Sequence, residues 1–219
     1  MGGVGLAPHS LRRVRGFSLV ELLVTVTIIG LLAALSFPSL NRARERARIA
    51  GCASNLSQIG KAMMLYAADN DGCFPPARES GLPWPMAYWP YKVNPYLANI
   101  KDSNAGYYAL CFNGVMRDPG KKDWNLNGPT DYQRISYGMN SFSTAELLDI
   151  RKRVASIDQP SKTMLVSDTA MAYPVLNSAK YLYTYYPCQR HFEKDNVLFC
   201  DGHVEAVPKD GMDVTFILK

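Results

Sequence analysis

An apolar run near the start of the chain restricts its fold more than any other feature. The run, FSLVELLVTVTIIGLLAALSF, occupies residues 17–37, and Glu21 is its single charged residue. As an α-helix it would extend about 31 Å, which is enough to cross the hydrocarbon core of a bilayer. We therefore predict a transmembrane segment over residues 17–37, preceded by a basic leader over residues 1–16.

The flanks of the run bear on its orientation. Arg12, Arg13 and Arg15 precede it with no acidic residue beside them, which favours an N-terminus held in the cytoplasm. Further arginines follow between Arg42 and Arg48, so the orientation rests on the leader alone. A secretory signal peptide also begins with basic residues, but this run is longer than an ordinary signal core and no small-x-small cleavage site closes it. We expect a single-pass anchor whose C-terminal domain lies outside the cytoplasm.

Glu21 is an unusual residue for such a segment. A carboxylate inside hydrocarbon costs roughly 2.5 to 3.5 kcal/mol or more, so it marks a functional hypothesis and needs a partner. If the chain is cut after Gly16, the new amino group of Phe17 lies one helical turn from Glu21, and the terminus of a neighbouring subunit could equally reach the carboxylate. The hypothesis is that Glu21 sets the register of a helical assembly. A plain signal anchor with a chance glutamate is the alternative.

The segment RGFSLVELLVTVTIIGLLAALSFPSL resembles the N-terminal segment of type IV prepilins and type II secretion pseudopilins. The resemblance implies that a prepilin peptidase cuts between Gly16 and Phe17 and methylates the new terminus. It also implies that Glu21 is the family's assembly glutamate and that Pro38 is the helix-kinking proline of many pilins. The partners implied are this peptidase, other pilin or pseudopilin subunits of a homo- or hetero-filament, and the inner membrane.

Beyond Pro38, apolar and polar residues alternate with the period of an amphipathic helix. The apolar positions are Ile49, Ala53, Leu56, Ile59, Met63 and Tyr66, and the polar positions are Arg42, Arg46, Asn55, Gln58 and Lys61. We predict that the helix continues over residues 38–70, packs its apolar stripe on a globular domain, and stops near Asp69, where the sequence reads DNDGCFPP.

The residues at that stop also suggest an ion site. Asp69, Asn70 and Asp71 before Gly72 match part of a calcium loop, although no downstream glutamate completes the spacing. Turn chemistry explains the same residues equally well. Residues 69–72 are therefore either part of a calcium site or a turn that ends the helix, and no cofactor is expected.

The remaining residues, 71–219, are predicted to form a loop-rich domain with an antiparallel sheet. Strand signals are ISYGMN from Ile135, TMLVSD at residues 163–168, and NVLFC and HVEAV on either side of Asp201-Gly202. A two-residue Asp-Gly loop favours a type I′ hairpin, which would pair Phe199 with Val204 and Leu198 with Glu205. Val197, Phe199, Val204 and Ala206 would then share an apolar face. The predicted class is α+β and pilin-like, with a long N-terminal helix on a small antiparallel sheet.

A second resemblance concerns the C-terminal part. His191 is followed by nine residues and then Asp201-Gly202, and this spacing is similar to the C-terminal motif of a prepilin-processing-associated group. Members of that group also show strands like SYGMN at residues 136–140 and PSKTMLVSD at residues 160–168. The resemblance assigns no role to His191, Asp201 or Gly202.

Several side chains near the end have the types needed for chemistry. Cys188, His191, Cys200 and His203 form two C-x2-H pairs with ligand types and pair spacing suited to tetrahedral zinc. A Cys188–Cys200 disulfide, or unlinked residues around a hairpin, are the rival interpretations in an exported domain. Asp168, His191, Asp195 and Asp201 are candidates for a polar cluster, but no nucleophile with a base and an orienting residue can be named. No catalytic residue is therefore predicted, and the chain is not expected to be an enzyme.

Charge and aromatic content complete the functional prediction. The formal net charge of +5 is contained in residues 1–50, so the body has no charge favouring nucleic acid. We predict a structural subunit of a pilus-like or pseudopilus-like filament. One alternative is a minor pilin that binds a carbohydrate or protein partner through aromatic loops; another is an anchored enzyme using His191 and Asp201. The aromatic residues are Trp84, Tyr88, Trp89, Tyr91 and Tyr96.

Overall fold

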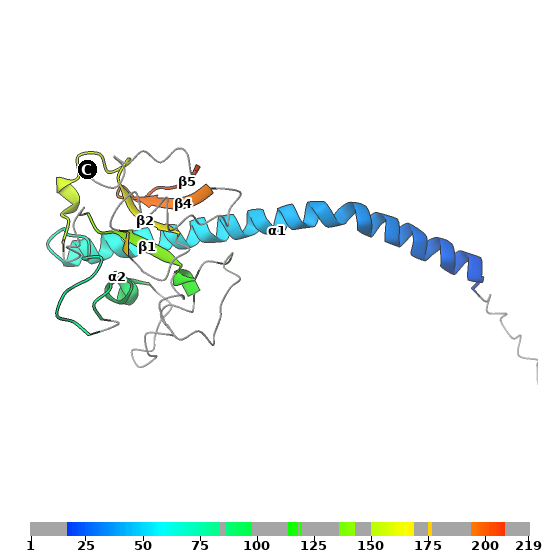
Figure 1. The fold of residues 1–219 in the computed structure, drawn as a ribbon, viewed down its shortest axis with the longest axis horizontal. Coiled ribbons are helices and arrows are strands. Elements are labelled where there is room, and N and C mark those ends of the chain that lie inside the picture. Colours follow the sequence, from blue (N-terminus) through cyan, green and yellow to red (C-terminus); the bar gives the residue numbers. More distant parts are fainter. Residues whose placement is uncertain are drawn as a thin grey trace, which may run out of the picture. The chain divides into compact units, whose positions relative to one another are not determined.

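A computed structural model describes most of the elements that the sequence predicts. The described residues are 17–83, 86–97, 114–117, 119, 136–142, 150–168, 175–176 and 194–208. The chain divides into two compact units, residues 1–43 and 44–219. One long helix, α1 (Leu19–Asp69), contributes to both units (Figure 1).

In the first unit, α1 is apolar and exposed. Within the part of the chain that the structure describes, it is the one helix long and apolar enough to cross a membrane. The polar side chains in this stretch are satisfied locally, because the hydroxyls of Thr27 and Ser36 donate to the carbonyls of Leu23 and Leu32 at 2.7 and 2.8 Å. Pro38 lies inside the helix and has no N–H to donate, yet α1 continues through it.

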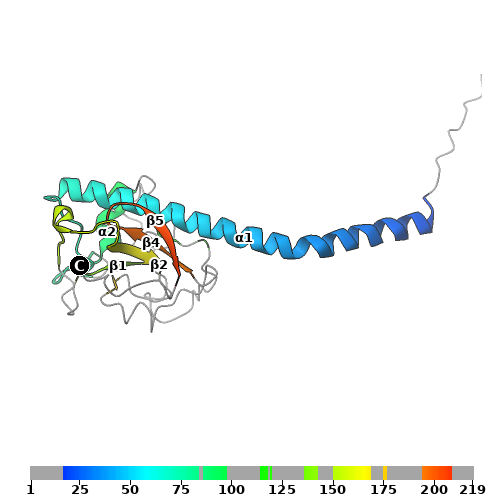
Figure 2. The same ribbon diagram turned by 90° about the horizontal axis from the view of Figure 1, so that it is seen from above.

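The second unit packs a five-stranded sheet beside residues 44–69 of α1 (Figure 2). The strands are β1 (Tyr137–Asn140), β2 (Met164–Asp168), β3 (Val175–Leu176), β4 (Lys194–Phe199) and β5 (Val204–Pro208), in the order β3-β1-β2-β4-β5. The pairs β1–β2, β2–β4 and β4–β5 are antiparallel, and the pair β1–β3 is parallel. The α+β class with a long helix on a small antiparallel sheet is therefore confirmed, and β3 is an addition that the sequence did not predict.

Short helices complete the described part of this unit. They are α2 (Trp89–Val93) and the 3-10 helices η1 (Asn94–Tyr96), η2 (Gly114–Met116) and η4 (Val154–Ser156). Both Asn94 and Trp89 are followed by a proline, whose fixed φ suits the start of a helix. Trp89 and Val93 anchor α2 to the core.

The predicted apolar stripe of α1 meets the sheet. Leu56, Ile59 and Met63 are fully buried, whereas Ile49 and Tyr66 are half-buried. The helix lies close to the sheet at Gly60, where an added Cβ would lie 2.9 Å from Cδ1 of Leu198. A glycine at this position allows α1 to approach β4 more closely than any other residue would.

The predicted register of the β4–β5 hairpin is wrong by one residue. The structure pairs Leu198 with Val204 and Val197 with Glu205, and the amide of Phe199 donates to the carbonyl of His203 at 2.9 Å. The loop therefore has three residues, 200–202, and not two. Its last residue, Gly202, has φ +94°, as in three-residue hairpins that end in a left-handed glycine.

This shift changes which side chains share a face. Leu198 and Val204 lie together on the side that packs against α1, and both contact the core. Phe199 lies on the other side with His203, and their rings stack at a centroid distance of 4.4 Å. The predicted apolar face of Val197, Phe199, Val204 and Ala206 is therefore incorrect, because a one-residue slip moves every side chain of a strand to the opposite face.

Candidate functional site

The start of α1 holds the described residues of the predicted processing and assembly site. Phe17 and Ser18 precede the first residue of the helix, and Phe17 is 75% exposed. Glu21 stands at the third helical position, where its Oε2 accepts a hydrogen bond from the backbone N–H of Ser18 at 2.9 Å. Gly16 lies outside the described residues.

This hydrogen bond gives Glu21 a partner within its own chain. A glutamate at the third position that binds the N-cap amide is one half of a capping box, and its charge also lies near the positive end of the helix dipole. Ser18 therefore has a helix-capping role, through its backbone N–H, that the sequence analysis missed. The signal was present, since Ser18 and Glu21 have the S-x-x-E spacing of that box.

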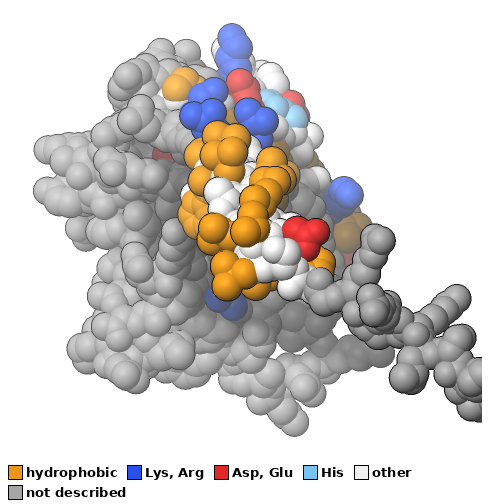
Figure 3. All heavy atoms as spheres, turned by 90° about the vertical axis from the view of Figure 1, so that its right-hand side faces the viewer, with side chains coloured by type: hydrophobic (Ala, Val, Ile, Leu, Met, Phe, Trp, Pro, Cys, Tyr) orange, Lys and Arg blue, Asp and Glu red, His pale blue; other side chains and the backbone are white. Residues whose placement is uncertain are grey.

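The next feature is a long exposed apolar surface on the first part of α1. Every large apolar side chain from Phe17 to Leu40 is at least 47% exposed. Figure 3, which faces the start of the helix, shows apolar side chains gathered over it. Soluble monomers rarely expose a continuous apolar patch of this extent, so the surface is built to meet lipid or other protein chains.

A buried polar cluster connects the second part of α1 with the sheet. The Cys52 thiol donates to Oδ2 of Asp168 at 3.6 Å, and the Tyr137 hydroxyl donates to the Cys52 sulfur at 3.6 Å. Asn55 donates to the Tyr137 hydroxyl at 3.2 Å and to the carbonyl of Arg117 at 2.8 Å. These hydrogen bonds join residues far apart in sequence, and such networks fix the position of one element on another.

Asp168 and Asp201, two of the four residues considered for a polar cluster, lie in different environments. Asp168 is buried beneath α1, whereas Asp201 is exposed in the β4–β5 loop. Asp201 accepts hydrogen bonds from its neighbour His203: its Oδ1 lies 3.1 Å from the backbone nitrogen and 2.6 Å from Nδ1. Burial raises the pKa of Asp201, but the hydrogen bonds from His203 outweigh it, and the net pKa lies below its usual value.

The Asp201-Gly202 pair of the C-terminal motif thus has a local structural role. Asp201 binds the amide two residues ahead, as aspartates do in tight turns. Gly202 supplies the positive φ and donates to the carbonyl of Phe199 at 3.0 Å. His191, the first residue of the motif, lies outside the described residues.

The residues considered for zinc lie in different environments. Cys200 is buried in the core as a free thiol, and burial raises its pKa to about 12. His203 is exposed on the hairpin. Cys188 and His191 lie outside the described residues, and within the described ranges no three His, Cys, Asp or Glu side chains converge as a metal site. The Cys188–Cys200 disulfide stays a prediction, because Cys188 is not among the described residues.

The acidic stretch after α1 ends the helix as predicted. The amide of Gly72 donates to the carbonyl of Ala67 at 2.9 Å, and the Asn70 side chain donates to the carbonyl of Tyr66 at 2.8 Å. Asp69 accepts a hydrogen bond from Tyr96 at 3.0 Å. The contacts of Gly72 and Asn70 satisfy backbone carbonyls in the last turn of α1, which is the turn chemistry predicted as the alternative to calcium.

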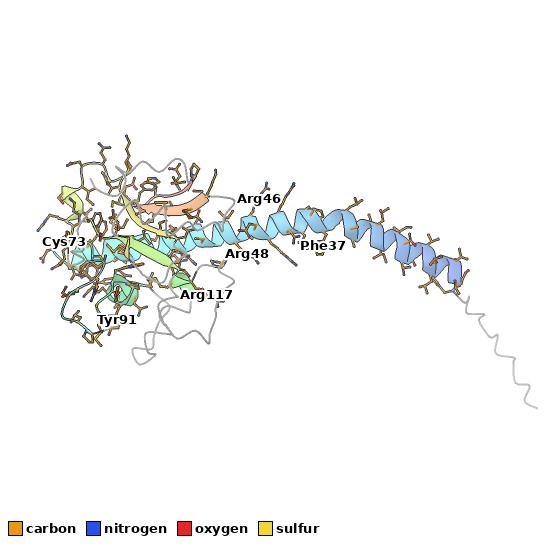
Figure 4. All side chains as sticks on the ribbon, viewed as in Figure 1. Phe37, Arg46, Arg48, Cys73, Tyr91 and Arg117 are labelled. Atoms are coloured by element: carbon orange, nitrogen blue, oxygen red, sulfur yellow. The ribbon has the colours of Figure 1, made fainter. Side chains whose placement is uncertain are left out.

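The aromatic segment mostly anchors a loop. Trp89 is fully buried and Tyr88 is 7% exposed, so neither presents a face to a sugar. Tyr91 is exposed on the surface (Figure 4). Trp84 lies outside the described residues. The aromatic-loop binding module is therefore not favoured.

Comparisons with known proteins agree on the N-terminal segment. A family model described as a prokaryotic N-terminal methylation motif matches residues 11–37. The chain is 38% identical over 61 residues to the type IV wide pilus major component PilA4 of Thermus thermophilus, covering 28% of this chain and 47% of that protein. It is 29% identical over 125 residues to the type II secretion system core protein G of Klebsiella pneumoniae, covering 57% of this chain and 82% of that protein.

A third relative extends the same pattern. The type II secretion system core protein G of Pectobacterium carotovorum subsp. carotovorum is 36% identical over 70 residues, which cover 32% of this chain and 44% of that protein. The chain thus spans about half the length of most of these curated relatives. No solved structure gives a significant match.

Proposed function

We propose that this chain, a prepilin-like and pseudopilin-like protein, is a structural subunit of a type IV pilus-like or type II secretion pseudopilus-like filament. In the filament, the apolar first part of α1 would pack against the same segment of neighbouring subunits. The second unit would be displayed outward on the sheet-bearing part of α1. The partners would be other pilin or pseudopilin subunits.

One observation carries the proposal. The exposed apolar helix that begins at Leu19 holds a carboxylate in its first turn and coincides with the matched methylation motif. A lone helix gains little by keeping Glu21 in such a surface, since a charge in hydrocarbon is costly. In an assembly, each Glu21 carboxylate would pair with the amino terminus of a neighbouring subunit. This pairing would offset the cost of the charge and so explain why the glutamate is kept.

The maturation step follows from the same segment. A prepilin peptidase would cleave the Gly16–Phe17 bond and methylate the amino group of Phe17. Before assembly, the subunit would be a single-pass protein of the inner membrane with its second unit outside the cytoplasm. The basic leader with Arg12, Arg13 and Arg15 supports this topology. The named relatives are pilus and secretion-system components, which supports a role without catalysis.

N-terminal sequencing and intact mass test the proposal directly. The protein would be isolated from membranes of cells with and without the prepilin peptidase. We expect a mature terminus at Phe17 with one added methyl group, and only when the peptidase is present. A Gly16→Ala variant is the matched control for the site of cleavage. An uncut chain in cells that contain the peptidase, or a cut beyond residue 37, would contradict the proposal.

A further inference from the structure

The segment of α1 that follows the apolar run carries a cluster of arginines with no assigned role. Arg42, Arg44 and Arg46 are exposed, and no carboxylate among the described residues forms an ion pair with them. Arg48 differs, because it binds Glu45 at 3.2 Å and is half-buried. We call Arg42, Arg44 and Arg46 the basic collar.

The collar lies on two opposite sides of the helix and does not form a stripe on one side. Residues two apart in an α-helix point to nearly opposite sides, as Arg46 and Arg48 show in Figure 4. Arg42 and Arg46, four apart, share one side, and Arg44 points to the other. A flat protein surface would contact the arginines on one side of the helix only, whereas a medium that surrounds the helix would contact the arginines on both sides.

The position along the helix identifies that medium. With Phe37 at the edge of the hydrocarbon, Arg42 lies about 8 Å beyond it and Arg46 about 14 Å, from the rise of 1.5 Å per residue. The headgroup layer is roughly 5 to 8 Å thick on each side of the hydrocarbon core. Arginine side chains extend back toward this layer by several ångströms, so the whole collar reaches the phosphates.

We infer that the basic collar binds the phosphate groups of anionic phospholipids in the outer leaflet, and thereby holds the unassembled subunit at a fixed depth. Guanidinium groups bind phosphate through paired N–H donors. Three uncompensated positive charges within about one turn favour anionic over zwitterionic lipids, since each basic residue near a membrane surface contributes about 1 kcal/mol. This inference rests on the proposed membrane-anchored stage and adds a lipid partner to it.

The test uses the full chain reconstituted in phosphatidylcholine bilayers that contain a trace of spin-labelled lipid. The fraction of motionally restricted label gives the preference of the protein for phosphatidylglycerol over phosphatidylcholine. For the triple variant Arg42→Gln, Arg44→Gln, Arg46→Gln, we expect the preference to fall at least about fivefold, the factor that corresponds to one juxtamembrane arginine. The leader arginines contribute equally in every variant, so the difference reports the collar.

Two further variants separate charge at the collar from charge in general. The triple lysine variant Arg42→Lys, Arg44→Lys, Arg46→Lys keeps the charge and is expected to retain most of the preference. The control variant Lys61→Gln, Lys162→Gln, Lys194→Gln removes the same charge from exposed positions of the second unit and is expected to match the wild type. The preference of the wild type is also expected to weaken in 0.5 M salt, because ions screen it.

Two outcomes would overturn the inference. They are an unchanged lipid preference in the glutamine variant and an equal loss of preference in the control variant. In both cases the protein would still enter the bilayer and be cleaved after Gly16, so failure of this inference is distinguishable from failure of the proposed function.

Discussion

The carboxylate of Glu21 accepts a hydrogen bond from the backbone N–H of Ser18 at 2.9 Å. The single charged residue of the apolar run therefore caps the helix that contains it. This local bond lowers the cost of keeping a charge in the membrane segment before any neighbour is present. In the proposed filament, the second oxygen of this carboxylate would be available to the amino terminus of another subunit.

Glu21→Ala is expected to leave leader cleavage possible while reducing incorporation into filaments several-fold, because the alanine variant has no charge to set the register. Immunoblots of sheared filaments and of membranes measure how much of the subunit is in each fraction, and the ratio of the two amounts reports incorporation. Glu21→Gln is the matched control, since its amide oxygen can still accept the Ser18 hydrogen bond. Normal assembly of the glutamine variant would show that capping, and not charge, is the role of this residue.

Gly60→Val is expected to destabilise the second unit by about 2 kcal/mol. The Cβ alone would approach Cδ1 of Leu198 to 2.9 Å, and Leu198 is fully buried, so its side chain has no room to move aside. Thermal melting of the full chain in detergent, followed by tryptophan fluorescence, measures the change. Ser54→Ala, at an exposed position of the same helix, should change the stability by less than about 0.5 kcal/mol. Equal melting temperatures for the two variants would mean that α1 and β4 are not in close contact.

Tyr137→Phe is expected to destabilise the second unit by about 1 kcal/mol, because it removes a hydroxyl that donates to Cys52 and accepts from Asn55. Tyr91→Phe provides a control at an exposed tyrosine. A double-mutant cycle that combines Tyr137→Phe with Cys52→Ala measures the coupling in the network. A coupling energy of zero would show that the buried polar cluster does not act as a unit.

Cys200 is expected to resist alkylation in the folded protein at pH 8.5, whereas Cys73 reacts. Burial raises the pKa of Cys200 to about 12, so the reactive thiolate is scarce below that pH, while Cys73 is a half-exposed free thiol. Peptide mass spectrometry after iodoacetamide treatment should show at least tenfold less modification at Cys200. Unfolding without reductant should then expose Cys200 to the reagent. Continued protection under those conditions would reveal a disulfide.

Much of the fold could be predicted because its signals are local. Residues 163–168 have the β-branched and apolar composition of a strand, and β2 occupies five of these positions, from Met164 to Asp168. The end of α1 at Asp69 follows from Asn, Asp and Gly residues that cannot extend a helix without loss. The positions of elements along the chain depend on neighbours a few residues away, so the sequence reports them directly.

The pairing of elements was harder to predict. Asp-Gly statistics favoured a two-residue loop, but the structure places Leu198 opposite Val204 with a three-residue loop. In this register Leu198 reaches Gly60 of α1, a contact across more than a hundred residues that local turn preferences do not contain. β3 also escaped prediction, because a two-residue strand has no measurable period.

The sequence by itself indicated the long apolar helix at the start of the chain, because residues 17–37 form a continuous apolar run long enough to cross a bilayer whatever else the chain does. The tertiary structure alone decided that Cys52 and Asp168 meet beneath α1 and that Cys200 is buried while His203 is exposed. Those facts depend on which faces of distant elements pack together, and packing is settled only when the whole core is formed.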